Sequence, residues 1–274
     1  MQAFAPNTLE LAFSTVLSTL STMQWNAQDI INWLLTKGTA QADLEALTQG
    51  LGSQFERADV PVSRMRIAIR TVHPLMTAFA TTWERETGPI KTNISAHGLE
   101  RQNDFAGSPM TIAVESKQTY RRNLLRLKPE DHSSLHDQHE RGASDYFCIP
   151  LLFGNQIAGV LVIVSDKHGG LDKDEEASLH QIAHTLAPII EVYRLTRLST
   201  AVAETYLGQR TGHRVLGGAI TRGHVDQIDA AILVSDLRGW TRLNTEKPVH
   251  AAVKIANQYF DIMDTAVRQN SGEF

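Results

Sequence analysis

Apolar side chains recur at three- and four-residue steps over most of the first sixty residues. This spacing places them on one face of a helix, and it occurs in three successive stretches, 9–20, 30–35 and 40–55. From residue 64 the period changes to two, because polar and apolar residues alternate over 64–72. Such alternation is typical of a strand with one solvent-facing side. We therefore predict an N-terminal helical segment, residues 1–60, followed by a sheet.

Further strands are expected on either side of a stretch without a clear pattern. Residues 75–83 predict a second strand, whereas residues 84–110 are rich in turn-forming Gly, Pro and Ser and predict no regular element. A short helix is expected over 131–141. The clearest strands are 145–153 and 156–165, which are β-rich and separated by a Gly-Asn pair typical of a two-residue hairpin turn.

A long helix is predicted to begin near residue 172. Acidic residues in its first turn suit the positive end of the helix dipole. Its apolar positions then step by three and four, the heptad spacing of helices that pair: Leu179, Ile182, Leu186, Ile189 and Tyr193. We interpret this stripe, 179–193, as a homodimer contact. Residues 194–223 continue mostly helical, carry many arginines and indicate a connector that shares in the dimer.

The last part of the chain predicts a new domain. Residues 228–235 (IDAAILVS) predict a buried strand, 236–241 a turn, 249–267 a helix, and 271–274 the start of another strand. One strand and one helix leave a sheet edge and an apolar helix face uncovered. We therefore expect these residues to be poorly ordered or packed against the preceding domain or a second chain.

Composition narrows the class of protein. The chain has 274 residues, 42% of them hydrophobic and 20% charged, which fits two globular domains and excludes collagen-like and disordered classes. With 26 basic and 30 acidic side chains the net charge is −4, so no nucleic-acid partner is expected. Because we find no basic secretory start and no apolar run of about 20 residues, we expect no membrane partner and a cytoplasmic location.

Cysteine and lysine/arginine positions offer little chemistry. The single cysteine, Cys148, excludes an internal disulfide and is expected to be a small buried side chain. A basic run could attract an anionic effector, although we interpret it as a solvated face: Lys117, Arg121, Arg122, Arg126 and Lys128.

Histidines form two groups that could hold a metal or haem. His132, His136 and His139 lie close together in sequence, and His180 and His184 are one helical turn apart. Neither group has a companion cysteine motif or the spacing of a zinc protease, so we interpret them as surface imidazoles. No haem or flavin is predicted.

The hairpin and the helix that follows it, residues 145–193, resemble the last third of a GAF-type sensor domain. In that family an antiparallel hairpin leads into a helix that packs on the sheet and connects to an effector domain. The resemblance implies a GAF-like sensor domain over 61–193, an antiparallel sheet flanked by helices, with an unknown small-molecule effector. Residues 194–227 would form the helical connector.

A second resemblance covers the last 47 residues. The segment Val234–Thr241 (VSDLRGWT), the helix residues Asn257, Tyr259-Phe260 and Met263, and the turn Ser271-Gly272-Glu273 follow in the order found at the start of a class III nucleotidyl cyclase catalytic domain. Residues 228–274 therefore resemble the truncated beginning of that ferredoxin-like domain. Together the two resemblances imply an α+β protein with a long connecting helix.

This cyclase resemblance implies a metal and phosphate site. Asp236 would be the first of two metal-binding aspartates, with the backbone carbonyl of Leu237 as a further ligand of two Mg or Mn ions. Phosphate oxygens of ATP would face the backbone N–H groups of a single turn: Arg238, Gly239, Trp240 and Thr241. Without the resemblance, an Asp in this position is most often a turn former and helix cap.

The family's site is incomplete in this sequence. A Gly-Asp pair with the second metal ligand, and the asparagine and arginine that act on the transition state, would lie beyond Phe274. The family's active site also forms between two catalytic domains. We therefore expect the chain to be inactive alone and to be the regulatory part of a cyclase that makes cyclic AMP and pyrophosphate from ATP as a full-length dimer. The residues present do not decide between ATP and GTP.

Two alternatives remain open. The chain could be a non-catalytic GAF-like sensor or dimerisation module, which depends on whether the coding sequence continues past Phe274. It could also be a GAF-like domain with its own haem or metal, which a visible absorption band would indicate.

Overall fold

The computed structural model describes residues 25–73, 76–87, 91–96, 107–218 and 231–272. The chain divides into two compact units, Met1–Arg197 and Leu198–Phe274. We describe each unit by itself. Among the described helices, none is both long and apolar enough to cross a membrane.

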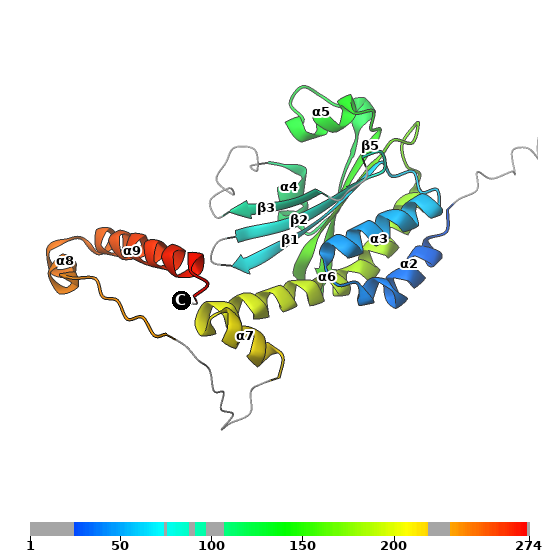
Figure 1. Ribbon diagram of the computed structural model, residues 1–274. Helices are drawn as coiled ribbons and strands as arrows, with labels where there is room; N and C mark the ends of the chain where they lie inside the picture. The colour runs from blue at the N-terminus through cyan, green and yellow to red at the C-terminus, as the bar shows by residue number, and fades with distance from the viewer. Residues whose placement is uncertain (1–24, 74–75, 88–90, 97–106, 219–230, 273–274) are drawn as a thin grey trace, which may run out of the picture. The chain divides into compact units, whose positions relative to one another are not determined.

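Unit 1 contains a sheet and several helices, and unit 2 contains helices only among its described residues (Figure 1). The helices are α2 (Ala27–Thr36), α3 (Leu44–Arg57), α4 (Pro109–Ser116), α5 (Ser133–Glu140), α6 (Lys173–Leu207), α7 (Gln209–Leu216), α8 (Trp240–Glu246) and α9 (Val249–Gln269). The strands are β1 (Arg64–His73), β2 (Met76–Glu84), β3 (Lys91–Ala96), β4 (Tyr120–Asn123), β5 (Asp145–Phe153) and β6 (Gln156–Ser165). Short 3-10 turns cover Gly38–Ala40 and Leu124–Arg126.

The sheet has six strands in the order β3-β2-β1-β6-β5-β4, and every neighbouring pair is antiparallel. The predicted hairpin is confirmed at both strands, and the predicted strands 64–72 and 75–83 correspond to β1 and β2. The expected antiparallel sheet flanked by helices is therefore confirmed. Strand β3 and helix α4 were not predicted, and both lie in or beside the turn-rich stretch 84–110.

The two faces of the sheet are covered by different helices. Helices α2, α3 and α6 lie on one face (Figure 1), where Met65, Ile67 and Ile69 of β1 join the larger core. The opposite face carries a smaller core with Val162 of β6 and residues of α4 and α5. Because successive side chains of a strand point to opposite faces, the alternation in β1 and β6 builds both cores at once.

Helix α3 approaches the sheet closely through small residues. A side chain at Gly52 would meet the ring of Trp83 at 2.5 Å, so only glycine leaves room for this fully buried tryptophan. The hydroxyls of Thr48 on α3 and Thr81 on β2 are 2.6 Å apart. These contacts fix the helix against β2.

The helix stripe predicted to pair with a second chain is instead buried in this chain's own core. Leu179, Ile182 and Leu186 are fully buried in the larger core. At Gly159 of β6, an added Cβ would lie 3.1 Å from Ile190 Cγ2, so α6 sits directly on the sheet. The interpretation of 179–193 as a dimer contact is therefore wrong for these side chains, because the sheet already covers them.

Helix α6 begins with a capping box. The carboxylate of Asp172 accepts from the backbone N–H of Glu175 at 2.9 Å, and the carboxylate of Glu175 accepts from the backbone N–H of Asp172 at 2.9 Å. The bond from the Glu175 N–H is the chief cause that lowers the pKa of Asp172. The acidic first turn that the sequence indicated thus fixes where the helix starts.

Three residues of the basic run form ion pairs, of which the one between Lys128 and Glu130, at 3.9 Å, is exposed. Arg121 binds the buried carboxylate of Asp145 at 2.7 Å and that of Glu176 at 2.6 Å, and it also donates to the Leu171 carbonyl at 2.7 Å. Arg122 pairs with Asp131. The Arg121 contacts join β4 and β5 to the start of α6, so this part of the run is structural.

The strand predicted at 228–235 is wrong over residues 231–235. These residues have no regular secondary structure, and Ile232, Leu233 and Val234 are exposed; residues 228–230 lie outside the described part. A strand needs a neighbour for its backbone groups, and the described part of unit 2 contains no other strand. The predicted helix 249–267 is confirmed as α9.

The predicted strand start at 271–274 is not formed at its described residues. Ser271 and Gly272 close the end of α9, because their N–H groups donate to the carbonyls of Arg268 and Val267 at 3.0 and 2.9 Å. Residues 273–274 lie outside the described part.

Candidate functional site

A cavity of about 200 Å³ lies on the smaller-core face of the sheet. Its walls come from β1, β5 and β6 and from the N-terminal ends of α4 and α5. The lining residues are Arg64, Arg66, Ser108, Pro109, Met110, His132, Ser134, Gln138, Tyr146, Val162 and Val164. No Asp or Glu is among them.

The β1–β6 register sets the floor of this cavity. Arg64 pairs with Val164 across the sheet, and Arg66 pairs with Val162. Side chains two residues apart share a face, so two guanidinium groups stand beside two valines. The floor is therefore half cationic and half apolar.

Arg66 is the least satisfied group in the cavity. Its Nε is buried and has no hydrogen-bond partner among the described residues. Burial lowers the pKa of Arg66, and the nearby charge of Arg64 lowers it further. Removing a cation from water without a partner is unfavourable. A negative charge placed next to Arg66 would therefore stabilise this arrangement.

Arg64 is only loosely compensated. Its guanidinium lies 3.5 Å from the carboxylate of Glu84, which also contacts Lys91 at 3.1 Å and Arg141 at 3.6 Å. Burial lowers the pKa of Arg64, against the raising effect of Glu84. The Glu84 carboxylate is thus shared by three cations. A net positive charge therefore remains next to the cavity.

Two capped helix ends also border the cavity. Ser108 Oγ accepts from the Thr111 N–H at 3.2 Å at the start of α4, and His132 Nδ1 accepts from the Ser134 N–H at 3.2 Å at the start of α5. Helix N-termini carry partial positive charge. The buried hydroxyl of Tyr146 keeps its proton, because burial raises the pKa of this tyrosine. The site therefore offers cations and donors beside apolar side chains.

The residues assigned to metal and phosphate by the cyclase resemblance form an exposed turn. The side chain of Asp236 is exposed, and the Leu237 carbonyl accepts from the Trp240 N–H at 3.2 Å. Gly239 has a φ of 78° and precedes the short helix α8 that holds Trp240 and Thr241. Arg238 is exposed in the same turn.

This turn is tied to its own unit by the Tyr259 hydroxyl, which donates to Ser235 Oγ at 2.7 Å. Across the described residues, no three His, Cys, Asp or Glu side chains are grouped so that they could hold a metal ion. The described residues thus supply one carboxylate, Asp236, and a binding centre for two ions would need further ligands.

The histidine groups and the cysteine occupy separate places. His132 caps α5 at the cavity, His136 Nε2 lies 3.1 Å from the Lys128 carbonyl, and His180 lies 3.9 Å from the Glu176 carboxylate. Cys148 is fully buried, and burial raises the pKa of its thiol to about 12. Its prediction as a small buried side chain is confirmed.

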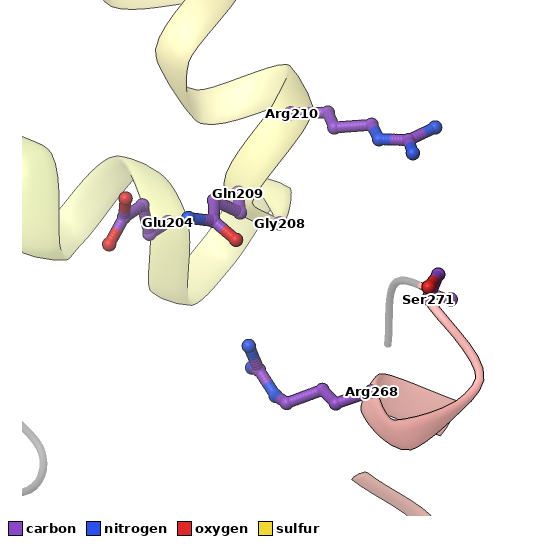
Figure 2. Close-up of a pocket in the computed structure, with 7 residues that line it drawn as sticks. Glu204, Gly208, Gln209, Arg210, Arg268 and Ser271 are labelled. Atoms are coloured by element: carbon purple, nitrogen blue, oxygen red, sulfur yellow. The ribbon is translucent and has the colours of Figure 1, made fainter. Parts of the chain in front are cut away.

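A second hollow lies in unit 2 (Figure 2). Its labelled residues come from the end of α6 and the start of α7, with Glu204, Gln209 and Arg210, and from the end of α9, with Arg268 and Ser271. These stretches are joined through residues 219–230, which lie outside the described part. We assign no function to this hollow.

Sequence reasoning missed the cavity, although part of its signal was present. The alternation over 64–72 correctly places Arg64 and Arg66 on one face, but that face was expected to meet solvent. Helix α4 covers it, and this helix, which begins at the end of the turn-rich stretch 84–110, was not predicted. Two arginines on one strand face without an acidic neighbour on that strand were the available clue.

No family model matches the chain, and no curated protein matches it either. Solved structures similar to it include the phycocyanobilin-bound GAF domain from a cyanobacterial phytochrome, at 14% identity and TM-score 0.45, which covers 63% of this chain and 98% of that one. The GAF domain of a two-component sensor histidine kinase from Bacillus halodurans has 18% identity and TM-score 0.38, covering 63% and 99%.

A third similar structure is the GAF domain of A. aeolicus nlh2 in an inactive state, at 11% identity and TM-score 0.43, covering 62% of this chain and 96% of that one. With identities this low and TM-scores below 0.5, these likenesses carry no argument about ligand or activity.

Proposed function

We propose that the chain is the sensor part of a class III nucleotidyl cyclase, with a small-molecule effector bound in the cavity of unit 1. The observation that carries this proposal is the path of α6. The helix is packed on the sheet of unit 1 at Ile190 and continues without interruption past Arg197 into unit 2. One continuous helix thus runs from the unit with the cavity into the unit that contains the cyclase-like residues.

Strand β6 provides the route from the cavity to α6. Val162 and Val164 line the cavity, whereas Leu161 and Ile163 belong to the core shared with α6 on the other face. Because cores are close-packed, an effector that displaces β6 also displaces the side chains of α6. The effector would in this way bias the geometry of the helix that leaves the sensor.

A homodimer belongs to the same proposal, through a different face of α6. An exposed stripe with heptad spacing runs along the helix beyond its sheet contact: Val192, Leu195, Ser199, Val202 and Tyr206. Since the stripe predicted earlier is buried, these side chains are the ones we expect to pair with a second copy.

In the full-length dimer, Asp236 and the Leu237 carbonyl would hold Mg or Mn ions, which would neutralise the pyrophosphate leaving group of ATP. The N–H groups of Arg238, Gly239, Trp240 and Thr241 would face phosphate oxygens. The bond between Trp240 N–H and the Leu237 carbonyl would then be exchanged for these ligands.

The first test is an assay for cyclic AMP with the purified 274-residue chain, ATP and Mn²⁺. We expect no product above the no-enzyme control, because only one carboxylate of the metal pair is present. Sequencing the gene beyond the codon for Phe274 is the second step. If the frame continues, the longer protein should make cyclic AMP and lose at least 100-fold in activity in Asp236→Ala, on the order expected for a lost catalytic ligand. A longer protein that is inactive, or unaffected by this change, would contradict the proposal.

The second candidate function is a sensor or dimerisation module without catalysis. It is favoured by the exposure of residues 231–236, which in the described structure form neither strand nor metal site. A stop codon directly after Phe274, together with effector binding by the purified chain, would decide for it.

A further inference from the structure

We infer that the cavity of unit 1 binds a small organic anion, whose carboxylate or phosphate oxygens are held by Arg66 and Arg64 while its short apolar part contacts Val162 and Met110. This inference rests on the proposed sensor function and specifies the ligand of that site.

Arg66 lacks a negatively charged partner in the described structure. Among the described residues, the buried Nε of Arg66 has no partner and no carboxylate lines the cavity. Arg121 on β4 is satisfied by Asp145 and Glu176, although 33% of its side chain is exposed. The chain therefore supplies acidic partners where an arginine is structural and leaves Arg66 without one.

The described residues around the cavity cannot supply this negative charge by a small rearrangement. Among the described residues, Glu84 is the only carboxylate that forms an ion pair with Arg64, and it already contacts Lys91 and Arg141. Turning it toward Arg66 would break those contacts. An anion from outside is the partner that satisfies both arginines without this loss.

The hydrogen-bond donors and the volume of the cavity suit a small anion. A guanidinium presents its N–H groups in a planar fork that matches carboxylate and phosphate oxygens. The Tyr146 hydroxyl and the N-terminal ends of α4 and α5 add further positive potential on the same side. The volume of about 200 Å³ is below the range of about 300–1,000 Å³ typical of drug-sized ligands, which favours a small molecule.

Calorimetric titration of the full 274-residue chain tests the inference with defined probes. Butyrate and propyl phosphate carry the two head groups on a short apolar chain, inorganic phosphate lacks the chain, and butyramide is the uncharged analogue of butyrate. We expect saturable binding of butyrate or propyl phosphate at one site, at least about tenfold tighter than butyramide, because hydrogen bonds to a charged group are lost in the amide. Tight phosphate binding without an effect of the apolar chain would overturn the part assigned to Val162 and Met110.

Matched variants assign the binding to the cavity. Arg66→Gln should weaken the bound anion about tenfold or more, and Arg66→Lys should also weaken it, because lysine keeps the charge but lacks the fork. Arg57→Gln removes the same charge from an exposed position of α3 and should bind as the natural chain does. Thermal unfolding without ligand checks that the Arg66 variants are folded; we expect their Tm to be no lower, because no described residue forms a hydrogen bond with the buried Nε of Arg66.

Three results would overturn the inference: no binding of any anionic probe, equal binding of butyramide, or unchanged anion binding in Arg66→Gln. Binding of butyramide alone, lost when Val162→Trp fills the cavity, would refute the anion while leaving the sensor function intact. A failed cyclase assay with intact anion binding would refute the cyclase and leave this inference standing.

Discussion

Two arginines on separate strands of one sheet, Arg121 on β4 and Arg66 on β1, differ in their partners. Arg121 is bound by two carboxylates and a backbone carbonyl, and its guanidinium lies 4.7 Å from the centre of the Phe147 ring. The buried Nε of Arg66 has no such partner in the part of the chain that the structure describes. A fully partnered arginine stabilises the fold, whereas an unpartnered one is retained at some cost. By this contrast, Arg121 is a structural residue and Arg66 is the residue that we expect to bind a ligand.

Asp145 should be among the most sensitive positions of unit 1. Its side chain is fully buried and binds both Arg121 and the Leu171 N–H, at 2.7 and 3.0 Å. Asp145→Ala leaves the partly exposed Arg121 guanidinium and the buried Leu171 N–H without this partner, so we expect a loss of about 1–3 kcal/mol in the free energy of unfolding. Urea denaturation followed by circular dichroism measures this.

The control is a surface ion pair of the same type. Asp166 lies 3.3 Å from Arg85 with 43% of its side chain exposed, so Asp166→Ala should cost at most about 1 kcal/mol. Equal losses in the two variants would show that burial of the Asp145 pair does not matter.

Among the elements, helix α6 has two faces that differ in burial. One face is buried on the sheet, and the other carries the exposed heptad stripe that includes Leu195 and Val202. The sequence contained both stripes, but spacing alone could not decide which one the chain's own sheet would cover. That choice depends on packing against β6, which lies in a different part of the fold.

The exposed stripe should control dimer formation. We expect the purified chain to be a dimer by sedimentation equilibrium, and Leu195→Glu to raise the dissociation constant at least about tenfold, because it places a charge in an apolar contact. Thr196→Glu, at the next and equally exposed position, should leave the dimer unchanged. A natural chain that is monomeric at all accessible concentrations, or equal effects of the two variants, would contradict this expectation.

Elements with strong local patterns were predictable, and those held by context were not. The hairpin 145–165 has β-rich strands and a specific turn, and its bounds agree with β5 and β6. Strand β3 (KTNISA) is short, polar and at the sheet edge, so its pattern carries little signal. The opposite error occurred at 231–235, where an apolar run has no neighbouring strand to pair with in the described unit.

On the scale of the whole molecule, the chain divides after Arg197, within α6. The cavity can be predicted only from the fold as a whole, because its arginines lie on β1 whereas the helices that cover them are α4 and α5. Sequence reasoning identified the strands that carry the cavity, yet it placed the functional residues at Asp236 and its neighbours. Those remain assigned by resemblance.

Unit 1 should fold without unit 2, because its two cores are formed by its own residues. We expect a chain ending at Arg197 to unfold cooperatively and to protect Cys148 from iodoacetamide at about pH 8. Burial raises the pKa of this thiol to about 12, so in the folded unit it is both covered and protonated. Labelling should become complete in guanidinium chloride.

Rapid labelling of the shortened chain, with the 274-residue chain protected under the same conditions, would show instead that unit 2 is needed for the fold of unit 1.

The central position of β1 has a consequence for synthesis on the ribosome. β1 pairs with β6, so that Ser63 donates to the Val164 carbonyl 101 positions later. At translation rates of about 5–20 residues per second, the nascent β1 waits on the order of 5–20 s for this partner. During that interval the chain has only the β1–β2–β3 half of its sheet, with the backbone N–H and C=O groups along one edge of β1 unpaired. Nascent chains should therefore recruit chaperones until β6 emerges, and the anion cavity can exist only after that moment.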